Sequence, residues 1–140
     1  MKCTTVRFID TNILLYAISG DPVDEEKRRV ADEILSARDL ALSTQVLQEF
    51  YVQATRPSRE FRLTHRQATG FITVFARFPV QATTLELVRV ALATRERYQI
   101  SYWDAAIIEA ARALGCSEVL SEDLNHGQSF DGLVVLNPFR

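Results

Sequence analysis

The stretch Val6-Arg7-Phe8-Ile9-Asp10-Thr11-Asn12 decides how the rest of the sequence is interpreted. Its first four residues are rich in the β-branched and aromatic side chains that favour a strand. The next three are residues that commonly cap the start of a helix. The stretch therefore predicts a short strand that leads directly into a helix over 13–19, with Asp10 at the junction.

The same alternation of strand and helix continues along the chain. Further strands are predicted over 40–42, 80–82, 118–120 and 133–136, and helices over 24–37, 44–55, 65–77, 84–98 and 102–114. This order predicts an α/β layer structure with a mainly parallel sheet of five strands. In such sheets, ligands bind outside the carboxyl ends of the strands, and that edge is where functional residues are expected.

Length and composition limit the class of protein. The chain has 140 residues, which is the length of one ordinary domain. Cys3 and Cys116 fit neither a metal-ligand spacing nor a disulfide framework, so we interpret both as small apolar residues at strand edges. No apolar run is long enough to cross a bilayer, and the first residues lack the pattern of a signal peptide. We therefore expect a cytoplasmic protein without membrane contact.

Four acidic residues stand out against this predicted sheet. Asp10 follows the first strand, and Asp123 follows the fourth. Asp104 lies on the predicted helix 102–114, on the same face as apolar residues three, four and seven positions later, whereas Glu109 lies roughly opposite. Glu49 lies on the helix that follows the second strand. A buried carboxylate needs a partner, because an unpaired buried charge is costly.

Each of these residues also has an ordinary structural interpretation. Asp10 can be a helix N-cap, and Asp104 can complete a capping box with Ser101. Glu49 can be an exposed helix residue, and Asp123 a turn residue. These separate interpretations predict no shared geometry. A site for Mg²⁺ or Mn²⁺ explains all four at once, because hard cations take oxygen ligands and promote reactions at phosphoryl groups.

Two other classes of function are compatible with an aspartate after the first strand. A phosphate-monoester hydrolase or phosphoacceptor domain has this feature, but Asp10 lacks the second carboxylate two residues later that common phosphatases use. No lysine follows Lys27 to meet a transferred phosphoryl group. A degenerate binding module of the same fold is the non-enzymatic alternative, and the intact set of four carboxylates argues against it.

Four blocks of sequence resemble the PIN-domain ribonucleases, specifically the VapC-type toxins of prokaryotic toxin–antitoxin pairs. These blocks, in the order and approximate spacing of the family, are Phe8–Tyr16, Ser43–Phe50, Ser101–Ile108 and Leu120–Gly127. The resemblance implies a three-layer α/β/α sandwich with a central, mainly parallel sheet, and a single PIN-like nuclease domain over residues 1–140. It also implies an endoribonuclease that hydrolyses RNA at a Mg²⁺ or Mn²⁺ site, forms a homodimer and is inhibited by a cognate antitoxin.

The resemblance assigns roles residue by residue. It implies that the catalytic and metal-binding residues are Asp10, Glu49, Asp104 and Asp123, supported by Thr11, Asn12 and Ser121. Glu122 is an alternative to Asp123 if the register of that loop differs. We interpret Tyr102 and Trp103 as core residues, His65 as a surface residue, and His126 as a residue that shapes its loop. The basic stretch from Arg56 to Arg66 is interpreted as a solvated connection, with RNA contact or docking of an acidic partner as alternatives.

Overall fold

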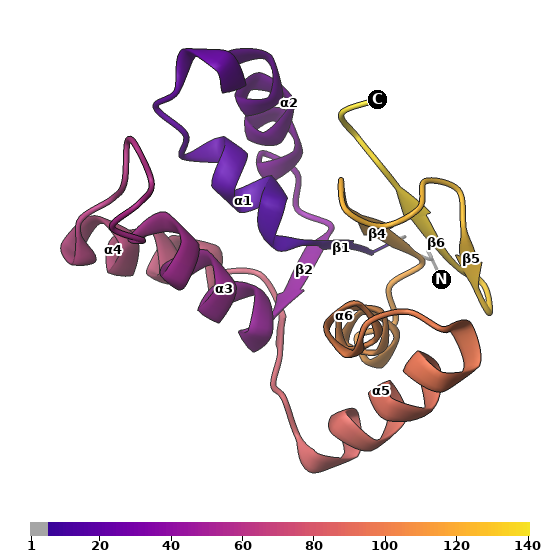
Figure 1. The fold of residues 1–140 in the computed structure, drawn as a ribbon. Coiled ribbons are helices and arrows are strands. Elements are labelled where there is room, and N and C mark those ends of the chain that lie inside the picture. The colour runs from indigo at the N-terminus through magenta and orange to yellow at the C-terminus, as the bar shows by residue number, and fades with distance from the viewer. Residues whose placement is uncertain (1–5) are drawn as a thin grey trace.

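A six-stranded sheet with strand order β3-β2-β1-β4-β6-β5 lies at the centre of the structure, a computed structural model that describes residues 6–140 (Figure 1). The strands are β1 (Arg7–Ile9), β2 (Leu40–Ser43), β3 (Val80–Gln81), β4 (Glu118–Leu120), β5 (Ser129–Phe130) and β6 (Leu133–Leu136). All neighbouring pairs are parallel except β5 and β6. The prediction of a mainly parallel sheet is therefore confirmed.

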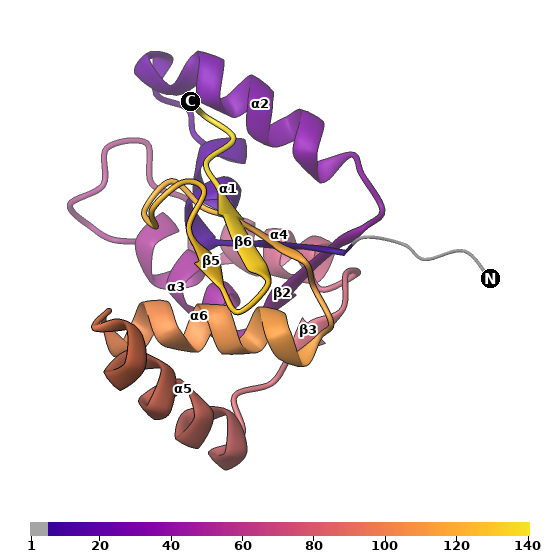
Figure 2. The same ribbon diagram turned by 90° about the vertical axis from the view of Figure 1, so that its right-hand side faces the viewer.

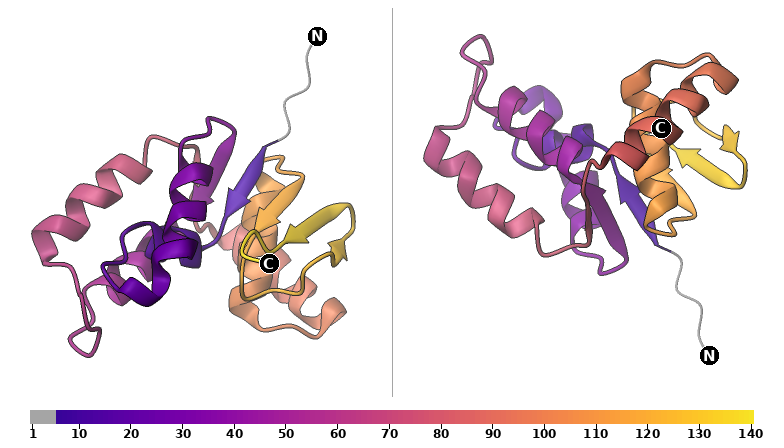
Figure 3. Two further views of the ribbon diagram at one scale, coloured as in Figure 1. Left: turned by 90° about the horizontal axis from the view of Figure 1, so that it is seen from above. Right: turned by 90° about the horizontal axis from the view of Figure 1, so that it is seen from below.

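Helices cover both faces of the sheet. They are α1 (Thr11–Ala17), α2 (Glu25–Leu35), α3 (Thr44–Ala54), α4 (His65–Phe75), α5 (Leu85–Tyr98) and α6 (Tyr102–Ala113), with a short 3₁₀ turn, η1 (Pro22–Asp24), before α2. In Figures 1 and 2, α1 and α2 lie on one side of the sheet and α5 and α6 on the other. Figure 3 shows α3 and α4 extending from the side of β2. The three-layer α/β/α sandwich is thus confirmed.

Local capping chemistry explains where the helices begin. The side chains of Ser43, Thr64, Thr84 and Ser101 each accept a hydrogen bond from a backbone N–H in the first turn of the following helix. The first helix begins at Thr11 rather than at the predicted residue 13, because its N-cap is Asp10. The capping pattern in the sequence therefore located four helix starts within a residue and missed the fifth by two.

Adjacent residues of one strand show that both faces of the sheet are buried. Phe8 and Ile9 have no exposed surface, and Val119 and Val135 on the next strands are equally buried. Successive side chains of a strand point to opposite faces, so two fully buried neighbours require cover on each face. The helices provide that cover, and the core therefore continues through the sheet.

One strand was not predicted. β5 pairs antiparallel with β6 through a hairpin in which Asp131 and Gly132 both have positive φ angles, 56° and 97°. With only two residues, β5 is too short to show an alternating pattern, so the expected five strands become six. Cys116 is buried just before β4, as expected, whereas Cys3 lies outside the described residues. Within residues 6–140, no helix has the length and apolar character needed to cross a membrane.

Candidate functional site

The pairing of β1 with β4 places Asp10 beside Ser121. Ile9 lies opposite Leu120 in the register, so the next residue of each strand emerges at the same carboxyl edge. The Asp10 N–H donates to the Leu120 carbonyl oxygen at 3.0 Å, and the Ser121 hydroxyl donates to Asp10 Oδ2 at 2.8 Å. The strand order reverses between β1 and β4, which is the position in open α/β sheets where ligands bind.

Asp10 combines a capping role with an unusual electrostatic environment. Its Oδ1 accepts a hydrogen bond from the Thr11 N–H at 2.7 Å, so the N-cap interpretation is correct for one of its two oxygens. The residue is 7% exposed, and its pKa is raised to about 6, mainly by burial. The hydrogen bonds from Ser121 and Thr11 oppose this increase, and the negative charges of Asp123 and Glu49 contribute to it.

Asn12 and Ser121 hold the loop that carries Asp123. Asn12 Nδ2 donates to Asp123 Oδ2 at 3.0 Å, and its Oδ1 accepts from the Glu122 N–H at 3.4 Å. The Ser121 hydroxyl oxygen accepts from the Asp123 N–H at 3.1 Å while it donates to Asp10. These two polar side chains therefore connect the first predicted block of sequence with the last.

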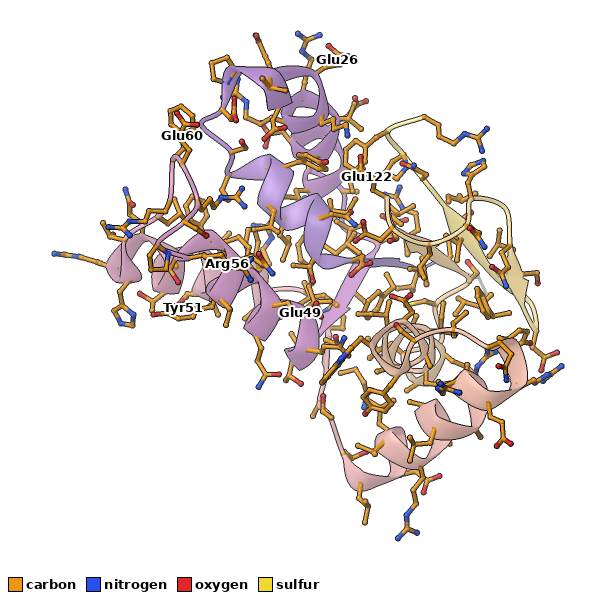
Figure 4. The ribbon with its side chains drawn as sticks, in the orientation of Figure 1. Glu26, Glu49, Tyr51, Arg56, Glu60 and Glu122 are labelled. Carbon is orange, nitrogen blue, oxygen red and sulfur yellow. The ribbon has the colours of Figure 1, made fainter. Side chains whose placement is uncertain are left out.

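Glu122 is turned toward a different cluster. Its carboxylate accepts hydrogen bonds from the Tyr16 hydroxyl and the Lys27 ammonium group, and Lys27 Nζ lies 4.9 Å from the centroid of the Tyr16 ring. Burial works against the charge of Glu122, but the bonds from Lys27 and Tyr16 keep its pKa below the usual value. In Figure 4, Glu122 lies toward α2 and the C-terminal segment, away from Glu49 on α3. Sequence reasoning missed Lys27 and Tyr16, because 95 and 106 residues separate them from Glu122.

Gln45 connects the two helices that carry the remaining carboxylates. Its Nε2 donates to Glu49 Oε1 at 2.9 Å and to the Trp103 carbonyl oxygen at 3.3 Å, which links α3 to α6. Glu49 is an exposed residue, yet partial burial of its carboxylate raises its pKa. Burial likewise raises the pKa of Asp104, against a hydrogen bond from Ser101. Sequence reasoning missed Gln45, although its position four residues before Glu49 is a local signal for such a bond.

The four predicted carboxylates influence one another electrostatically. The charge of Asp123 raises the pKa values of Asp10, Glu49 and Asp104, and the charge of Asp104 raises that of Glu49. The structure therefore brings side chains from β1, α3, α6 and the loop after β4 to one region. Within the described residues, however, no three acidic, histidine or cysteine side chains are grouped closely enough to hold a metal ion.

The four carboxylates have the chemistry that a hard divalent cation requires, but their side-chain positions do not define which of them would coordinate it. Carboxylate oxygens are the ligands that Mg²⁺ and Mn²⁺ prefer. In the part of the chain that the structure describes, the Thr11 hydroxyl oxygen is the only buried side-chain polar atom without a hydrogen-bond partner. Buried polar groups are normally satisfied, so an unpaired oxygen next to Asp10 is unusual.

One expectation about α6 is wrong. Trp103 is 65% exposed instead of buried, because the packing that encloses residues 105–111 does not reach this side chain in the first turn. Tyr102 packs against the small cluster of Ala91, Ala105 and Ala106, as expected of a residue at the edge of the core. Glu109 lies on the face of α6 that contacts α5, and it is buried there.

The neighbours of Glu109 give it a structural role. The Thr94 hydroxyl donates to its Oε2 at 2.8 Å, and Arg112 Nε donates to its Oε1 at 3.2 Å. These contacts tie α6 to α5, the pair of helices that packs most extensively in the structure. Glu109 therefore helps to hold α6 against α5.

The two histidines behave as expected. His126 Nδ1 accepts a hydrogen bond from the Asn137 N–H at 2.9 Å, which fixes the loop before β5. His65 is exposed and its ring nitrogen lies 2.8 Å from the Tyr51 hydroxyl. The basic stretch covers the connection between α3 and α4 and the first two residues of α4, and three of its arginines, Arg56, Arg62 and Arg66, are exposed.

The structure is thus an α/β/α sandwich with carboxylates at the edge of the sheet where the strand order reverses. The chain belongs to the PIN domain family, whose sequence model matches residues 7–128. No curated protein matches the chain.

Solved structures share this fold at low sequence identity. A toxin–antitoxin complex from Klebsiella pneumoniae is 21% identical, with 94% of this chain and 97% of that chain covered and a TM-score of 0.70. VapC20 of Mycobacterium tuberculosis, described as a toxin that cleaves the sarcin–ricin loop, is 20% identical over 84% of this chain and 91% of that chain, with a TM-score of 0.65. VapBC2 of Rickettsia felis, bound to a DNA fragment from its promoter, is 16% identical over 94% and 97%, with a TM-score of 0.64.

Proposed function

We propose that the protein is a metal-dependent endoribonuclease that hydrolyses RNA phosphodiester bonds and acts in the cytoplasm as the toxin of a toxin–antitoxin pair. The observation that carries this proposal is the hydrogen-bond network at the carboxyl edge of the sheet, in which Ser121 joins Asp10 to the Asp123 loop and Gln45 joins Glu49 to α6, the helix of Asp104. Membership of the PIN domain family supports it. Similar solved structures include toxin–antitoxin complexes and a toxin that cleaves an RNA loop.

In this proposal the four carboxylates hold Mg²⁺ or Mn²⁺. When bound, such a cation polarises a phosphoryl oxygen and neutralises the charge that develops during hydrolysis. The protein's own contribution is to position the ligands: Ser121 orients Asp10, Asn12 orients Asp123, and Gln45 orients Glu49. Side chains that orient metal ligands in this way have large effects on metal affinity.

Glu122 has no role as a metal ligand in this proposal. Its two carboxylate oxygens are occupied by Tyr16 and Lys27, on the side of the loop away from Glu49. The cluster of Lys27, Tyr16 and Glu122 instead fixes one side of the loop, while Asn12 and Ser121 fix the other. Asp123 is thereby presented to the site from a loop held on both sides.

An apolar groove on α3 and α4 is the surface that we assign to the antitoxin. It has a volume of about 600 Å³ and is lined by Thr44, Leu47, Gln48, Tyr51, Val52 and Ile72. A groove of this character between two helices suits the apolar face of an incoming peptide segment. The toxin–antitoxin complexes among the similar structures favour this occupant. The resemblance to VapC-type toxins also predicts a homodimer.

Cleavage assays separate the proposal from its rivals. The protein is incubated with RNA and with a chromogenic phosphate ester, in Mn²⁺, in Mg²⁺ and in EDTA. Cleavage of RNA only in the presence of metal supports the nuclease. Cleavage of the ester without cleavage of RNA supports a phosphohydrolase, and RNA binding without either reaction supports a binding module. Glu96→Ala, which removes an exposed carboxylate on α5, is the matched control for Asp104→Asn.

A further inference from the structure

Trp103 is a large aromatic side chain that the fold leaves in solvent beside the acidic edge. It is 65% exposed, and it directly precedes Asp104. Its ring meets the Tyr102 ring edge to face, with centroids 5.1 Å apart and an interplanar angle of 78°. Val52, which is 55% exposed, lines the same pocket as Trp103, and such an exposed apolar cluster, unlike a single apolar side chain, marks a binding surface.

A pocket of about 270 Å³ adjoins the indole ring. It is lined by Gln45, Gln48, Glu49, Val52, Gln53 and Trp103. Glu49 belongs to both this pocket and the carboxylate set, and the two hydrogen bonds of Gln45 fix the pocket wall relative to the Trp103 backbone. Whatever occupies the pocket is therefore adjacent to the candidate reaction centre.

We propose that this pocket binds one unpaired nucleobase of RNA, which stacks on Trp103 next to the scissile phosphate. The identity of the ligand as RNA rests on the proposed function. An indole ring offers a stacking surface to any base, and the side-chain amides of Gln48 and Gln53, which line the pocket, can offer both donors and acceptors to a base edge. A base inside a helix presents neither its face nor its pairing edge. The preferred substrate is therefore single-stranded or looped RNA.

Charge along α3 supports a nucleic acid as the occupant. Gln53 follows Glu49 by four residues and so lies on the same face of α3, and Arg56 comes two residues after the last residue of this helix. Figure 4 labels Glu49 on α3 and Arg56 beyond the end of that helix, where Arg56 begins the basic stretch. An RNA strand whose base stacks on Trp103 thus extends from the carboxylates toward Arg56, and arginine side chains bind phosphate well. A peptide segment of the antitoxin or a second copy of the chain is the rival occupant.

Fluorescence provides a readout that does not depend on catalysis. Trp103 is the only tryptophan in the sequence, so indole emission reports on this pocket alone. The wild-type protein in EDTA is titrated with a six-nucleotide oligoadenylate and with an abasic ribose-phosphate oligomer of equal length. We expect quenching and a blue shift with the base-containing oligomer and no change with the abasic one. Equal responses to both oligomers, or no response to either, would contradict the proposal.

Steady-state kinetics in Mn²⁺ test the same pocket during turnover. We expect Trp103→Ala to raise KM for single-stranded RNA about 5-fold to 150-fold, the range that corresponds to the loss of one base stack, with a smaller change in kcat. Trp103→Phe should retain most of the affinity. Leu92→Ala, which trims another exposed apolar residue that lies on α5 and does not line the pocket, should match wild type. Thermal melts establish that each variant is folded.

The outcomes distinguish this inference from the proposed function. Metal-dependent cleavage with equal KM values for wild type and Trp103→Ala overturns the base site and leaves the nuclease intact. Base-dependent quenching without cleavage in any metal overturns the nuclease and leaves the base site intact. If Trp103→Ala instead converts a dimer to a monomer in sedimentation, or abolishes antitoxin binding without changing KM, the pocket is a protein interface and the proposal is wrong.

Discussion

The Ser121 hydroxyl donates a hydrogen bond to Asp10 Oδ2 at 2.8 Å, across 111 residues of sequence. Both side chains are buried, and the same hydroxyl oxygen accepts a bond from the Asp123 N–H. One serine therefore sets the positions of two carboxylates that come from different ends of the chain. This relationship exists because β1 and β4 are neighbours in the sheet with Ile9 opposite Leu120.

Removal of that hydroxyl should weaken the site. In Ser121→Ala, the buried Asp10 loses a donor to its charged form, so the free energy of unfolding near neutral pH should fall by about 1–3 kcal/mol. The affinity for Mn²⁺ should fall as well, because neither carboxylate is held in place. Urea denaturation and Mn²⁺ titration measure the two effects. Ser117→Ala, at an exposed serine just before β4, is the control, and equal values for both variants would refute this role.

The pKa of Asp10 predicts how stability depends on pH in EDTA. The folded state holds this pKa at about 6, above the ordinary value of 3.8, so the folded protein binds more protons than the unfolded chain between these values. The free energy of unfolding should therefore fall as pH rises through this window, by up to about 3 kcal/mol, and level off above it. Asp10→Asn should remove most of this decrease. Parallel pH profiles for wild type and Asp10→Asn would show that Asp10 is not the cause.

Lys27 should act on the site through Glu122. Because the pair is partly exposed, Lys27→Met should cost only about 0–1 kcal/mol of stability. Loosening the Asp123 loop should nevertheless weaken Mn²⁺ binding by up to about tenfold, the lower end of the effect of groups that orient metal ligands. Lys27→Arg should recover part of the affinity. The double variant with Glu122→Gln should lose no more than either single variant, and additive losses in calorimetric titrations would contradict the mechanism.

The chemistry of the RNA ends tests the type of reaction. A cation-dependent hydrolysis uses water rather than the RNA 2′-hydroxyl as nucleophile, so the products should carry 5′-phosphate and 3′-hydroxyl ends. Mass spectrometry of a cleaved oligonucleotide identifies these ends directly. Cyclic 2′,3′-phosphate ends that form in EDTA would exclude the proposed reaction.

Local signals explain which parts of the fold the sequence predicts. Ser43, Thr64, Thr84 and Ser101 located helix starts because capping is a contact within a few residues. β5 left no alternating pattern, although the Asp-Gly pair at 131–132 is a hairpin signal that was overlooked. The proximity of Asp10 and Asp123 followed from the rule that functional groups gather at the carboxyl edge of a parallel sheet, whereas Glu49 and Asp104 were added by the metal-site interpretation and the resemblance to PIN-domain ribonucleases.

Contacts between distant segments explain what the sequence did not reveal. The bond between Lys27 and Glu122 joins α2 to the loop after β4, and nothing near either residue indicates the other. The exposure of Trp103 depends on how far the packing of α5 and the sheet extends along α6, which no local pattern encodes. The roles of the four carboxylates in metal binding and catalysis remain predictions from the sequence and the proposal built on it.

The central claim is that Asp10, Glu49, Asp104 and Asp123 form one shared metal site, and thermal melts with graded Mn²⁺ test it most directly. Wild type should gain about 2.7 kcal/mol of stability at a Mn²⁺ concentration one hundred times the dissociation constant. Asp10→Ala and Asp104→Ala should lose most of that gain, whereas Glu96→Ala should keep it. An equal Mn²⁺-dependent shift in all four proteins would contradict the shared site and the nuclease proposed from it.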